Sequence, residues 1–442
     1  MPKGTYLFPN GFLWGTATAA HQVEGQNENN NWFAWENEPG RIFEGQRVGN
    51  ACDWWNGRWK EDLTNAANDG QNSHRLSIEW SRIEPVPGMW DENAIAYYRE
   101  IIKGMRKMGL EPMVTLHHFT DPLWIYEQGG WENDATPNHF VNFVRKVVPA
   151  LKDIVNLWVT INEPAVYSNG GYLDGSFPPG KKDIVATFNV MLNMLKGHAA
   201  AYQIIHEVQS DAIVGFAKNY RGLEPSRPWF PPDVWITNFI SRSFNDSFSN
   251  AIKNGIFKFS LKKEHVPQAI GTQDFVGVNY YSMDKVAFNL SAFKEVFHRR
   301  YYPDGAQISE TGFIANIPQG MYASLIWAHQ FNLPIYVTEN GIEDSKDSMR
   351  PTYLIEHLRQ VWRAANANWQ VKGYYHWSQI DNFEWDRGWS QRFGLWGLEL
   401  DTQKRIRRQS VDLYAAICKE NGINSEIVRA FAPEIFNKLF PG

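Results

Sequence analysis

The segment LWVTINE (157–163) is a short run of apolar and β-branched residues that ends in Asn162 and Glu163. PIYVTEN (334–340) repeats this pattern and ends in Glu339 and Asn340. Six further apolar segments end in polar or aromatic residues, namely FLWGTATA (12–19), HRLSIEW (74–80), PMVTLHH (112–118), AIVGFAK (212–218), FVGVNYY (275–281) and GYYHWSQ (373–379). Short runs of this composition are typical of buried strands. The sequence therefore predicts eight β-strands.

Longer stretches with helical periodicity separate these strands. AIAYYREIIKGMRKMG (94–109) and TPNHFVNFVRKVVPALKD (136–153) place apolar residues at three- and four-residue spacing. Gly109 fits a C-terminal cap, and Thr136 with Pro137 fits an N-cap followed by proline at the first helical position. Alternating strands and helices indicate a parallel sheet, and eight units favour a closed barrel. We expect an α/β fold in which residues 1–442 form one (β/α)8 TIM barrel domain.

Three stretches are predicted to be long loops. They are residues 29–50, residues 221–233 and the region from Met283 to about Pro318. Long connections after barrel strands often carry function. We therefore expect these loops to form the walls of an active-site cleft.

Composition excludes several classes of protein. The chain of 442 residues has 43 Lys plus Arg against 48 Asp plus Glu, a formal net charge of −5, which argues against nucleic-acid or anionic-membrane binding. No apolar run reaches the length of about 18 residues that a membrane helix needs. Cys52 and Cys418 are far apart and suggest neither a disulfide framework nor a zinc site. We expect a soluble, cytoplasmic protein, and its oligomeric state stays open.

Two glutamates at strand ends indicate a reaction. Glu163 closes the fourth strand and Glu339 the seventh, and these strand ends face each other across the mouth of a barrel. Two carboxyl groups in one cleft can hydrolyse a glycosidic bond, with retention at a separation of about 5–5.5 Å and inversion at about 6.5–9.5 Å. Alternatively, each glutamate caps a helix or pairs with an arginine.

The motifs around these glutamates resemble a known family. TINEP (160–164), YVTENG (336–341) and WSQIDNFEW (377–385) are similar to the signatures of glycoside hydrolase family 1, the β-glucosidase and β-galactosidase family. The resemblance continues through FPNGFLWGTATAAHQVEG (8–25), SIEWSRIEP (77–85), LHHFTDPLW (116–124), GYLDGSFPPG (171–180), VGVNYYS (276–282) and RFGL (392–395). It covers about residues 6–420 and leaves the tail 421–442 outside.

The resemblance implies a retaining mechanism with Glu163 as acid/base and Glu339 as nucleophile. It places Arg75 and Tyr281 beside the nucleophile, where they would keep it ionised. In the same family pattern, Asn162 would hydrogen-bond the sugar 2-hydroxyl, while Asn279 would orient Glu163 and Tyr281.

The resemblance also implies a sugar-binding set. Gln22, His117 and Glu384 would bind hydroxyls, and Trp385 would add an indole donor. Glu384 would hold the 4- and 6-hydroxyls, and its carboxylate argues against phosphorylated sugars. Trp377 would form the floor under the sugar ring and Phe393 would close the same wall.

The adjacent histidines are not expected to bind a metal. Side chains alternate faces along a strand, so His117 and His118 cannot both point into the barrel. We expect His117 to bind the sugar and His118 to be packed. No metal or cofactor is expected.

Together these features predict a retaining exo-β-glycosidase that removes terminal β-D-glucosyl units from small-molecule glycosides or oligosaccharides. Side activity on β-galactosides or β-fucosides and transfer to alcohols are further expectations. Ala165 stands where many family members have tryptophan after the acid/base motif, so aglycone preference is left open. The alternative is a non-catalytic carbohydrate-binding protein on the same barrel, which would have no reason to keep both glutamates.

Overall fold

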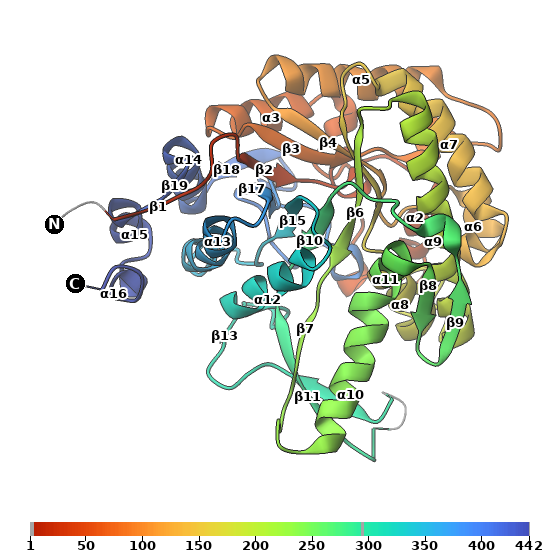
Figure 1. The fold of residues 1–442 in the computed structure, drawn as a ribbon. Helices are drawn as coiled ribbons and strands as arrows, with labels where there is room; N and C mark the ends of the chain where they lie inside the picture. Colours follow the sequence, from red (N-terminus) through yellow and green to blue (C-terminus); the bar gives the residue numbers. More distant parts are fainter. Residues whose placement is uncertain (1–3, 293–295, 442) are drawn as a thin grey trace.

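The computed structural model describes residues 4–292 and 296–441, and at its centre eight parallel strands close into a barrel (Figure 1). Around the barrel the strands are β2 (Leu13–Ala17), β3 (Ser73–Ser77), β4 (Glu111–His117), β5 (Leu157–Asn162), β6 (Ile213–Asn219), β10 (Val276–Asn279), β15 (Ile335–Asn340) and β16 (Val371–Trp377). Every residue of β3, β5, β10 and β15 is buried, as strands covered on both faces require. The eight predicted strands and the (β/α)8 fold are confirmed.

Helices cover the outside of the barrel, one long helix after each strand (Figure 1). They are α3 (Trp59–Asn68), α5 (Glu92–Lys107), α7 (Thr136–Leu151), α9 (Ile184–Val208), α11 (Ser247–Asn254), α12 (Pro318–His329), α13 (Arg350–Asn366) and α14 (Gln409–Glu420). The apolar faces of these helices and the outward side chains of the strands build the core between the two layers.

The two predicted helices are present, with one difference at a cap. Gly109 follows the C-terminus of α5 with a φ of +81°, so the predicted glycine cap is confirmed. The predicted N-cap at Thr136 is wrong, because Ala135 is the N-cap and Pro137 is the second residue of α7. The Thr136 hydroxyl donates instead to the Gly130 carbonyl at 2.6 Å, which leaves it no role as a cap.

The three predicted loops contain regular structure. Residues 29–50 include the short helix α2 (Asn31–Glu36). The other two stretches pair with each other, because β7 (Gly222–Pro225) and β12 (His298–Tyr301) flank β11 (Met283–Phe288) in a three-stranded sheet. This sheet and α10 (Pro231–Ser241) form an arm that projects from the barrel (Figure 1). Residues 293–295 of the last stretch lie outside the described residues.

The C-terminal tail packs beside the N-terminus (Figure 1). Strand β19 (Gly422–Asn424) pairs antiparallel with β1 (Thr5–Leu7), and α15 (Ser425–Phe431) and α16 (Phe436–Leu439) follow. Val428 and Leu439 are buried in the same apolar cluster as α13 and α14. The amphipathic pattern of the tail therefore serves to cover one end of these helices.

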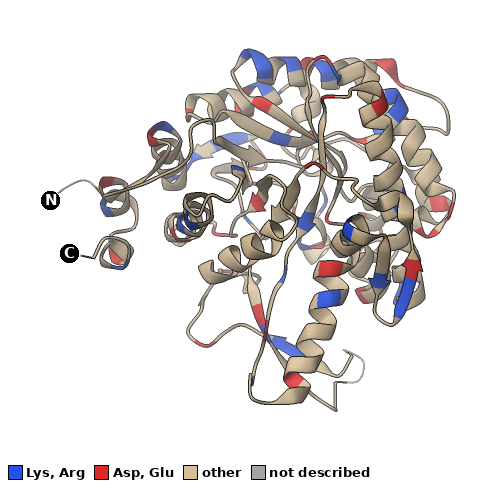
Figure 2. Ribbon diagram, viewed as in Figure 1, with Lys and Arg blue, Asp and Glu red and all other residues tan. Residues whose placement is uncertain are grey.

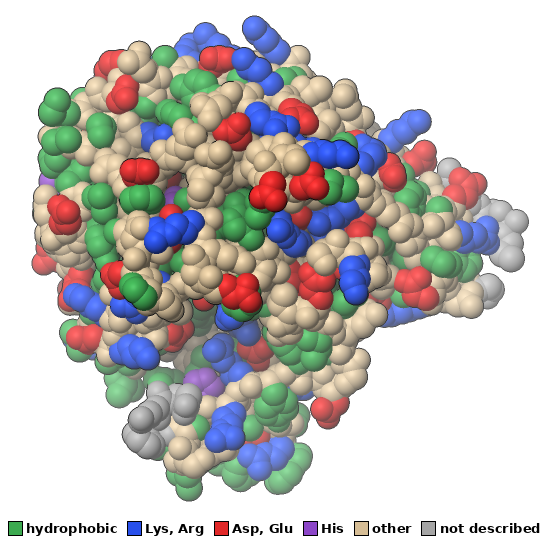
Figure 3. All heavy atoms as spheres, turned by 180° about the vertical axis from the view of Figure 1, so that it is seen from behind, with side chains coloured by type: hydrophobic (Ala, Val, Ile, Leu, Met, Phe, Trp, Pro, Cys, Tyr) green, Lys and Arg blue, Asp and Glu red, His purple; other side chains and the backbone are tan. Residues whose placement is uncertain are grey.

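Charges of both signs are spread over the outer helices and loops (Figure 2). One face of the surface likewise shows acidic and basic side chains interspersed, with scattered apolar groups between them (Figure 3). Among residues 4–292 and 296–441, no helix combines the length and hydropathy of a membrane span.

Candidate active site

Glu163 lies at the turn between β5 and the short helix α8 (Pro164–Asn169). Its φ of +45° is rare for a residue other than glycine, and such backbone strain is concentrated at functional sites. The side chain does not cap α8. Its Oε1 accepts hydrogen bonds from Asn279 Nδ2 at 2.7 Å and Asn219 Nδ2 at 2.9 Å. The ends of β6 and β10 thus hold this carboxyl group.

Glu339, on β15, is held by a charge and a hydroxyl. Its Oε1 accepts from Arg75 Nη1 at 2.6 Å, and its Oε2 accepts from the Tyr281 hydroxyl at 2.6 Å. Arg75 comes from β3 and is 1% exposed, so the ion pair is shielded from water. A guanidinium paired in this way favours the ionised form of the carboxyl group.

A continuous chain of hydrogen bonds connects the two glutamates. Arg75 Nη2 donates to Asn162 Oδ1 at 2.7 Å. Asn279 Nδ2 lies 3.2 Å from the same Asn162 oxygen and 2.7 Å from Glu163. Asn162, Asn279 and Glu339 lie at the C-terminal ends of β5, β10 and β15. Glu163 directly follows β5, and Arg75 lies in the middle of β3. The fold therefore brings the predicted catalytic residues into one cluster.

The two carboxyl groups have unequal surroundings. Burial, with a further contribution from the negative charge of Glu339, raises the pKa of Glu163 to about 7. Burial also raises the pKa of Glu339, but the Arg75 charge and the Tyr281 hydroxyl oppose that rise. Among the described residues Glu339 contacts a cation and Glu163 contacts amides, so the surroundings favour the ionised form more at Glu339 than at Glu163.

A second polar cluster surrounds Glu384. Gln22, on the short helix α1 (Ala20–Glu24), donates from Nε2 to Glu384 Oε2 at 3.3 Å and to Asn382 Oδ1 at 2.9 Å. Trp377 Nε1 approaches the same Glu384 oxygen at 3.5 Å. Burial raises the pKa of Glu384 well above its usual value, and the charge of Glu339 adds to the rise. The Trp377 ring also stacks on His118, which contacts Asn162, so the two clusters lie close together.

The sequence assignment of the adjacent histidines is reversed. His117 is packed on the helix side, where its Nε2 lies 2.9 Å from Asp121 Oδ1 and its ring meets Trp131 edge-on. His118 Nε2 lies 3.0 Å from Asn162 Nδ2, and its ring stacks on Trp377 at 5.8 Å. The two side chains do diverge, as predicted. The prediction placed the wrong one at the site because β4 ends at His117, and strand alternation no longer fixes the direction of the next side chain.

Aromatic rings complete the site beside His118. Trp385 stacks on His118 at a centroid distance of 5.9 Å. Phe393 meets the Tyr281 ring edge-on at 6.2 Å, next to the hydroxyl that binds Glu339. Trp377, Trp385 and Phe393 are thus assembled around the two polar clusters.

Two buried polar atoms at the site have no hydrogen-bond partner among the described residues, namely Gln22 Oε1 and His118 Nδ1. Burial and the Arg75 charge hold the pKa of His118 well below its usual value, so the ring is neutral. Since Asn162 donates to Nε2, the proton lies on Nδ1. One free acceptor and one free donor are the groups that a ligand hydroxyl can satisfy.

The model of the family described as glycosyl hydrolase family 1 matches residues 5–423. The chain belongs to glycosyl hydrolase family 1. It is therefore a glycoside hydrolase, a class of enzyme in which a pair of carboxyl groups usually carries out the reaction.

Relatives match this family 1 chain over nearly its whole length. Beta-glucosidase A of Thermotoga maritima is 34% identical, over 94% of this chain and 98% of that protein. The beta-galactosidase of Pyrococcus woesei is 30% identical, over 95% of this chain and 99% of that protein. The solved structure of the beta-glycosidase from Pyrococcus horikoshii superposes with a TM-score of 0.90 at 34% identity, covering 97% of this chain and 98% of that one.

Two residues of the family 1 site were missed by sequence reasoning. Asn219 contacts Glu163 but lies one position beyond the segment taken as the fifth strand, and β6 extends to include it. Thr338, beside Glu339, donates from Oγ1 to Asn279 Oδ1 at 2.6 Å and thereby orients the Asn279 amide toward Glu163. A search for polar residues at every strand end would have found Asn219.

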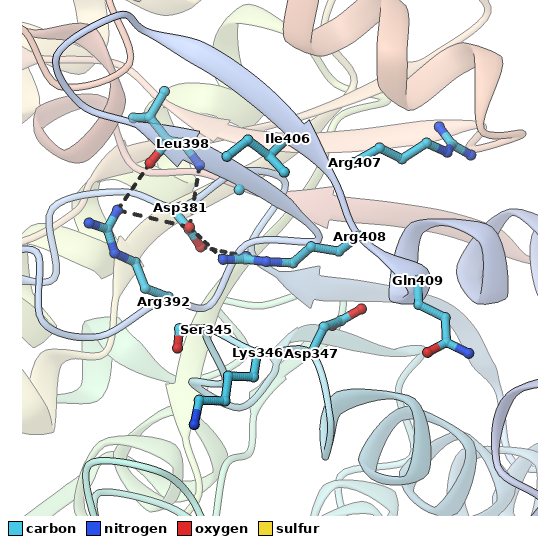
Figure 4. A pocket seen from close by; sticks show the side chains of 11 residues that line it. Ser345, Lys346, Asp347, Asp381, Arg392, Leu398, Ile406, Arg407, Arg408 and Gln409 are labelled. Carbon is cyan, nitrogen blue, oxygen red and sulfur yellow. Dashed lines mark hydrogen bonds and ion pairs between the residues drawn. The ribbon is translucent and has the colours of Figure 1, made fainter.

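A pocket of about 420 Å³ is lined by Asp381, Arg392, Arg408 and their neighbours, and none of the site residues line it (Figure 4). Its centre is Asp381, which accepts two hydrogen bonds of 2.8 Å from Arg408 and one of 3.0 Å from the Gly394 N–H. Arg408 Nη1 also donates to the Gly394 carbonyl at 2.6 Å, so Arg408 holds both ends of residues 381–394. The Arg408–Asp381 ion pair therefore supports the segment that carries Glu384 and Phe393.

We predict that His118→Ala weakens catalysis far more than His117→Ala. Loss of the His118 contacts to Asn162 and Trp377 should reduce kcat/KM for 4-nitrophenyl β-D-glucoside by about tenfold or more, equivalent to about 1.4 kcal/mol. His117→Ala should instead lower the free energy of unfolding by about 1–3 kcal/mol, because Asp121 and Trp131 lose a buried partner. Steady-state kinetics and urea unfolding measure the two effects. A larger kinetic loss in His117→Ala would contradict the placement.

Proposed function

We propose that this family 1 enzyme is a retaining, exo-acting β-glucosidase that removes terminal non-reducing β-D-glucosyl units. The observation that supports this most is the inequality of the two carboxyl groups. Glu339 contacts Arg75, whereas Glu163 contacts only amides and has a pKa raised to about 7. A nucleophile must be ionised and a general acid must be protonated at the same pH.

In the first half-reaction, the Glu339 carboxylate attacks the anomeric carbon while Glu163 gives its proton to the glycosidic oxygen. The bond to the leaving group breaks and an ester to Glu339 forms. The ester is neutral, so the repulsion that helped raise the pKa of Glu163 disappears. In the second half-reaction, Glu163 takes a proton from water, the water oxygen attacks the anomeric carbon, and the ester bond breaks. The product keeps the β configuration.

The surrounding residues bind and orient the sugar in this proposal. Asn162, held by Arg75 and His118, would contact the 2-hydroxyl. Gln22, His118 and Glu384 would bind the remaining hydroxyls, and Trp377 would stack under the ring. The Glu384 carboxyl group disfavours phosphorylated sugars, because it would repel a phosphate.

The range of substrates is proposed on chemical grounds. Among the described residues, the Glu384 carboxyl group accepts from the Gln22 and Trp377 side chains, and a carboxyl group can accept from the 4-hydroxyl of either C4 epimer, which supports side activity on β-galactosides and β-fucosides. The names of the Thermotoga and Pyrococcus relatives fit this range. Ala165, which follows the acid/base motif, is small, and a wide leaving-group side would admit alcohols as acceptors in transglycosylation. Both cysteines are buried free thiols, which supports a cytoplasmic location.

A non-catalytic carbohydrate-binding protein is not favoured. Such a protein would retain the stacking ring and the hydroxyl-binding groups. It would gain nothing from a strained Glu163 backbone or from a buried Arg75–Glu339 ion pair next to a second carboxyl group.

Removal of the nucleophile tests the mechanism. Glu339→Ala should reduce turnover of an activated aryl β-glucoside by several orders of magnitude, and sodium azide should restore it by occupying the vacated space. Because azide attacks from the nucleophile's side with no second displacement, the product should be the α-glucosyl azide. Anomeric assignment by NMR reads the result.

Glu163→Ala is the matched control for that experiment. Its nucleophile is intact, so azide should act in the second step and yield the β-glucosyl azide. A β-azide from Glu339→Ala would refute the assignment of the two roles.

The pH dependence follows from the raised pKa of Glu163. Since Glu163 must hold its proton to protonate the leaving group, kcat/KM should fall as pH rises through about 7. On the acid side, kcat/KM should fall when Glu339 is protonated. In Glu163→Gln, which has no proton to lose, the alkaline fall that the wild type shows with the same aryl β-glucoside should disappear. An unchanged alkaline limb in that variant would show that another group titrates.

A further inference from the structure

A buried lysine on β6 is linked to the Glu163 carboxyl group through one residue, Asn219. Lys218, on β6, is 1% exposed, and its Nζ lies 4.4 Å from the centroid of the Phe244 ring. Among the described residues it makes no ion pair. A charged group is costly to bury without a partner, and a lysine in such a position is rarely retained for stability.

Two hydrogen bonds connect Lys218 to Glu163. Its Nζ donates to the main-chain carbonyl of Asn219. The Asn219 side chain in turn donates from Nδ2 to Glu163 Oε1 at 2.9 Å. One residue therefore joins the ammonium group to the carboxyl group, and a shift of the lysine would move the amide that holds Glu163.

Charged groups from several elements act on this pair. The acidic groups acting on Lys218 are Glu163 and Asp246, which lies at the end of the turn Arg242–Asp246. Asp246 accepts from Trp327 Nε1 at 3.0 Å and also lies near Arg242 and Tyr220. The charges acting on Glu163 are Glu339, which raises its pKa, and Lys218, which lowers it. Lys218 thus opposes the effect of Glu339 on the pKa of Glu163.

Lys218 and Glu163 change charge in the same pH range. Burial lowers the pKa of Lys218 to about 7, although Glu163 and Asp246 oppose that fall. The pKa of Glu163 is raised to about 7. While Lys218 is charged, it stabilises the carboxylate form of Glu163, which is the form that remains once the proton has gone to the leaving group and that then accepts a proton from water.

We propose that Lys218 is a positioning residue for the acid/base: it fixes Glu163 through Asn219, and its charge makes the Glu163 proton easier to release. This inference rests on the proposed role of Glu163. It assigns a function to a buried charge that the double-displacement mechanism does not otherwise use.

The test compares pH profiles of kcat/KM for an aryl β-glucoside with a poor leaving group. Lys218→Met removes both the charge and the hydrogen bond, whereas Lys218→Gln removes the charge and keeps a donor for the Asn219 carbonyl. Both should move the alkaline limb upward by about one pH unit, the lower end of the effect of an opposite charge on a nearby carboxyl group. Lys218→Arg keeps the charge at every pH used and should leave the limb at or below its wild-type position.

Lys253→Met is the matched control. Lys253 also stands over a phenylalanine ring, 5.8 Å from the Phe331 centroid, but it lies in the last turn of α11. Its profile should coincide with that of the wild type. Thermal unfolding of each variant verifies that it is folded. If Lys218→Met does not fold, the pH profiles of Lys218→Gln and Lys218→Arg test the inference.

An alkaline limb that stays in place in both Lys218→Met and Lys218→Gln overturns the inference, even if the rate falls at every pH. If the alkaline limb moves in Lys218→Met but not in Lys218→Gln, the hydrogen bond to Asn219 causes the shift, and the proposed role of the charge is overturned as well. Failure of the proposed function looks different, because the alkaline limb would then persist in Glu163→Gln. If that limb disappears in Glu163→Gln but is unmoved in the Lys218 variants, only the inference about Lys218 fails.

Discussion

The buried ion pair between Arg75 and Glu339 is the contact on which the arrangement of the site depends. The guanidinium uses Nε for Thr115 Oγ1 at 3.1 Å, Nη1 for Glu339 and the Thr338 carbonyl, and Nη2 for Asn162. These partners come from β4, β15 and β5, so one side chain from β3 connects four strands of the barrel. Desolvating two charges seldom adds stability, even when they are well paired. We infer that this pair is kept because it fixes the charge and orientation of a reacting carboxylate.

Surroundings, rather than residue type, distinguish the two glutamates. Glu339 belongs to a regular strand and faces a cation, whereas Glu163 follows its strand in a left-handed backbone conformation and faces amide donors. Asn162 and Asn279 join the two environments, so displacement of either glutamate would be transmitted to the other. Lys218 and Asn219 extend this network to the back of Glu163. A barrel whose strands all end at one face can position such a set because every strand contributes a side chain there.

Much of this architecture could be predicted from local sequence. The eight strands were evident because each is a compact apolar run, and both glutamates stood at their ends. Directions of side chains beyond a strand end were not predictable: His117 and His118 were exchanged because β4 ends between them. The pairing of β7 with β11 was also missed, since it joins segments about 60 residues apart, and local composition contains no signal for such pairing. Thr136 was misplaced because its hydroxyl has a partner, Gly130, that only the tertiary structure supplies.

The central claim is that Glu339, made anionic by Arg75, forms the bond to the sugar while Glu163 handles the proton. Its most direct test is to trap the glycosyl-enzyme with a 2-deoxy-2-fluoro-β-glucoside that carries an activated leaving group, and to locate the label by peptide mass spectrometry. The fluorine destabilises the oxocarbenium-like transition states, so the ester should accumulate. We expect one 2-fluoroglucosyl group on Glu339. A label on Glu163, or turnover through no covalent adduct with an inverted product, would contradict the account.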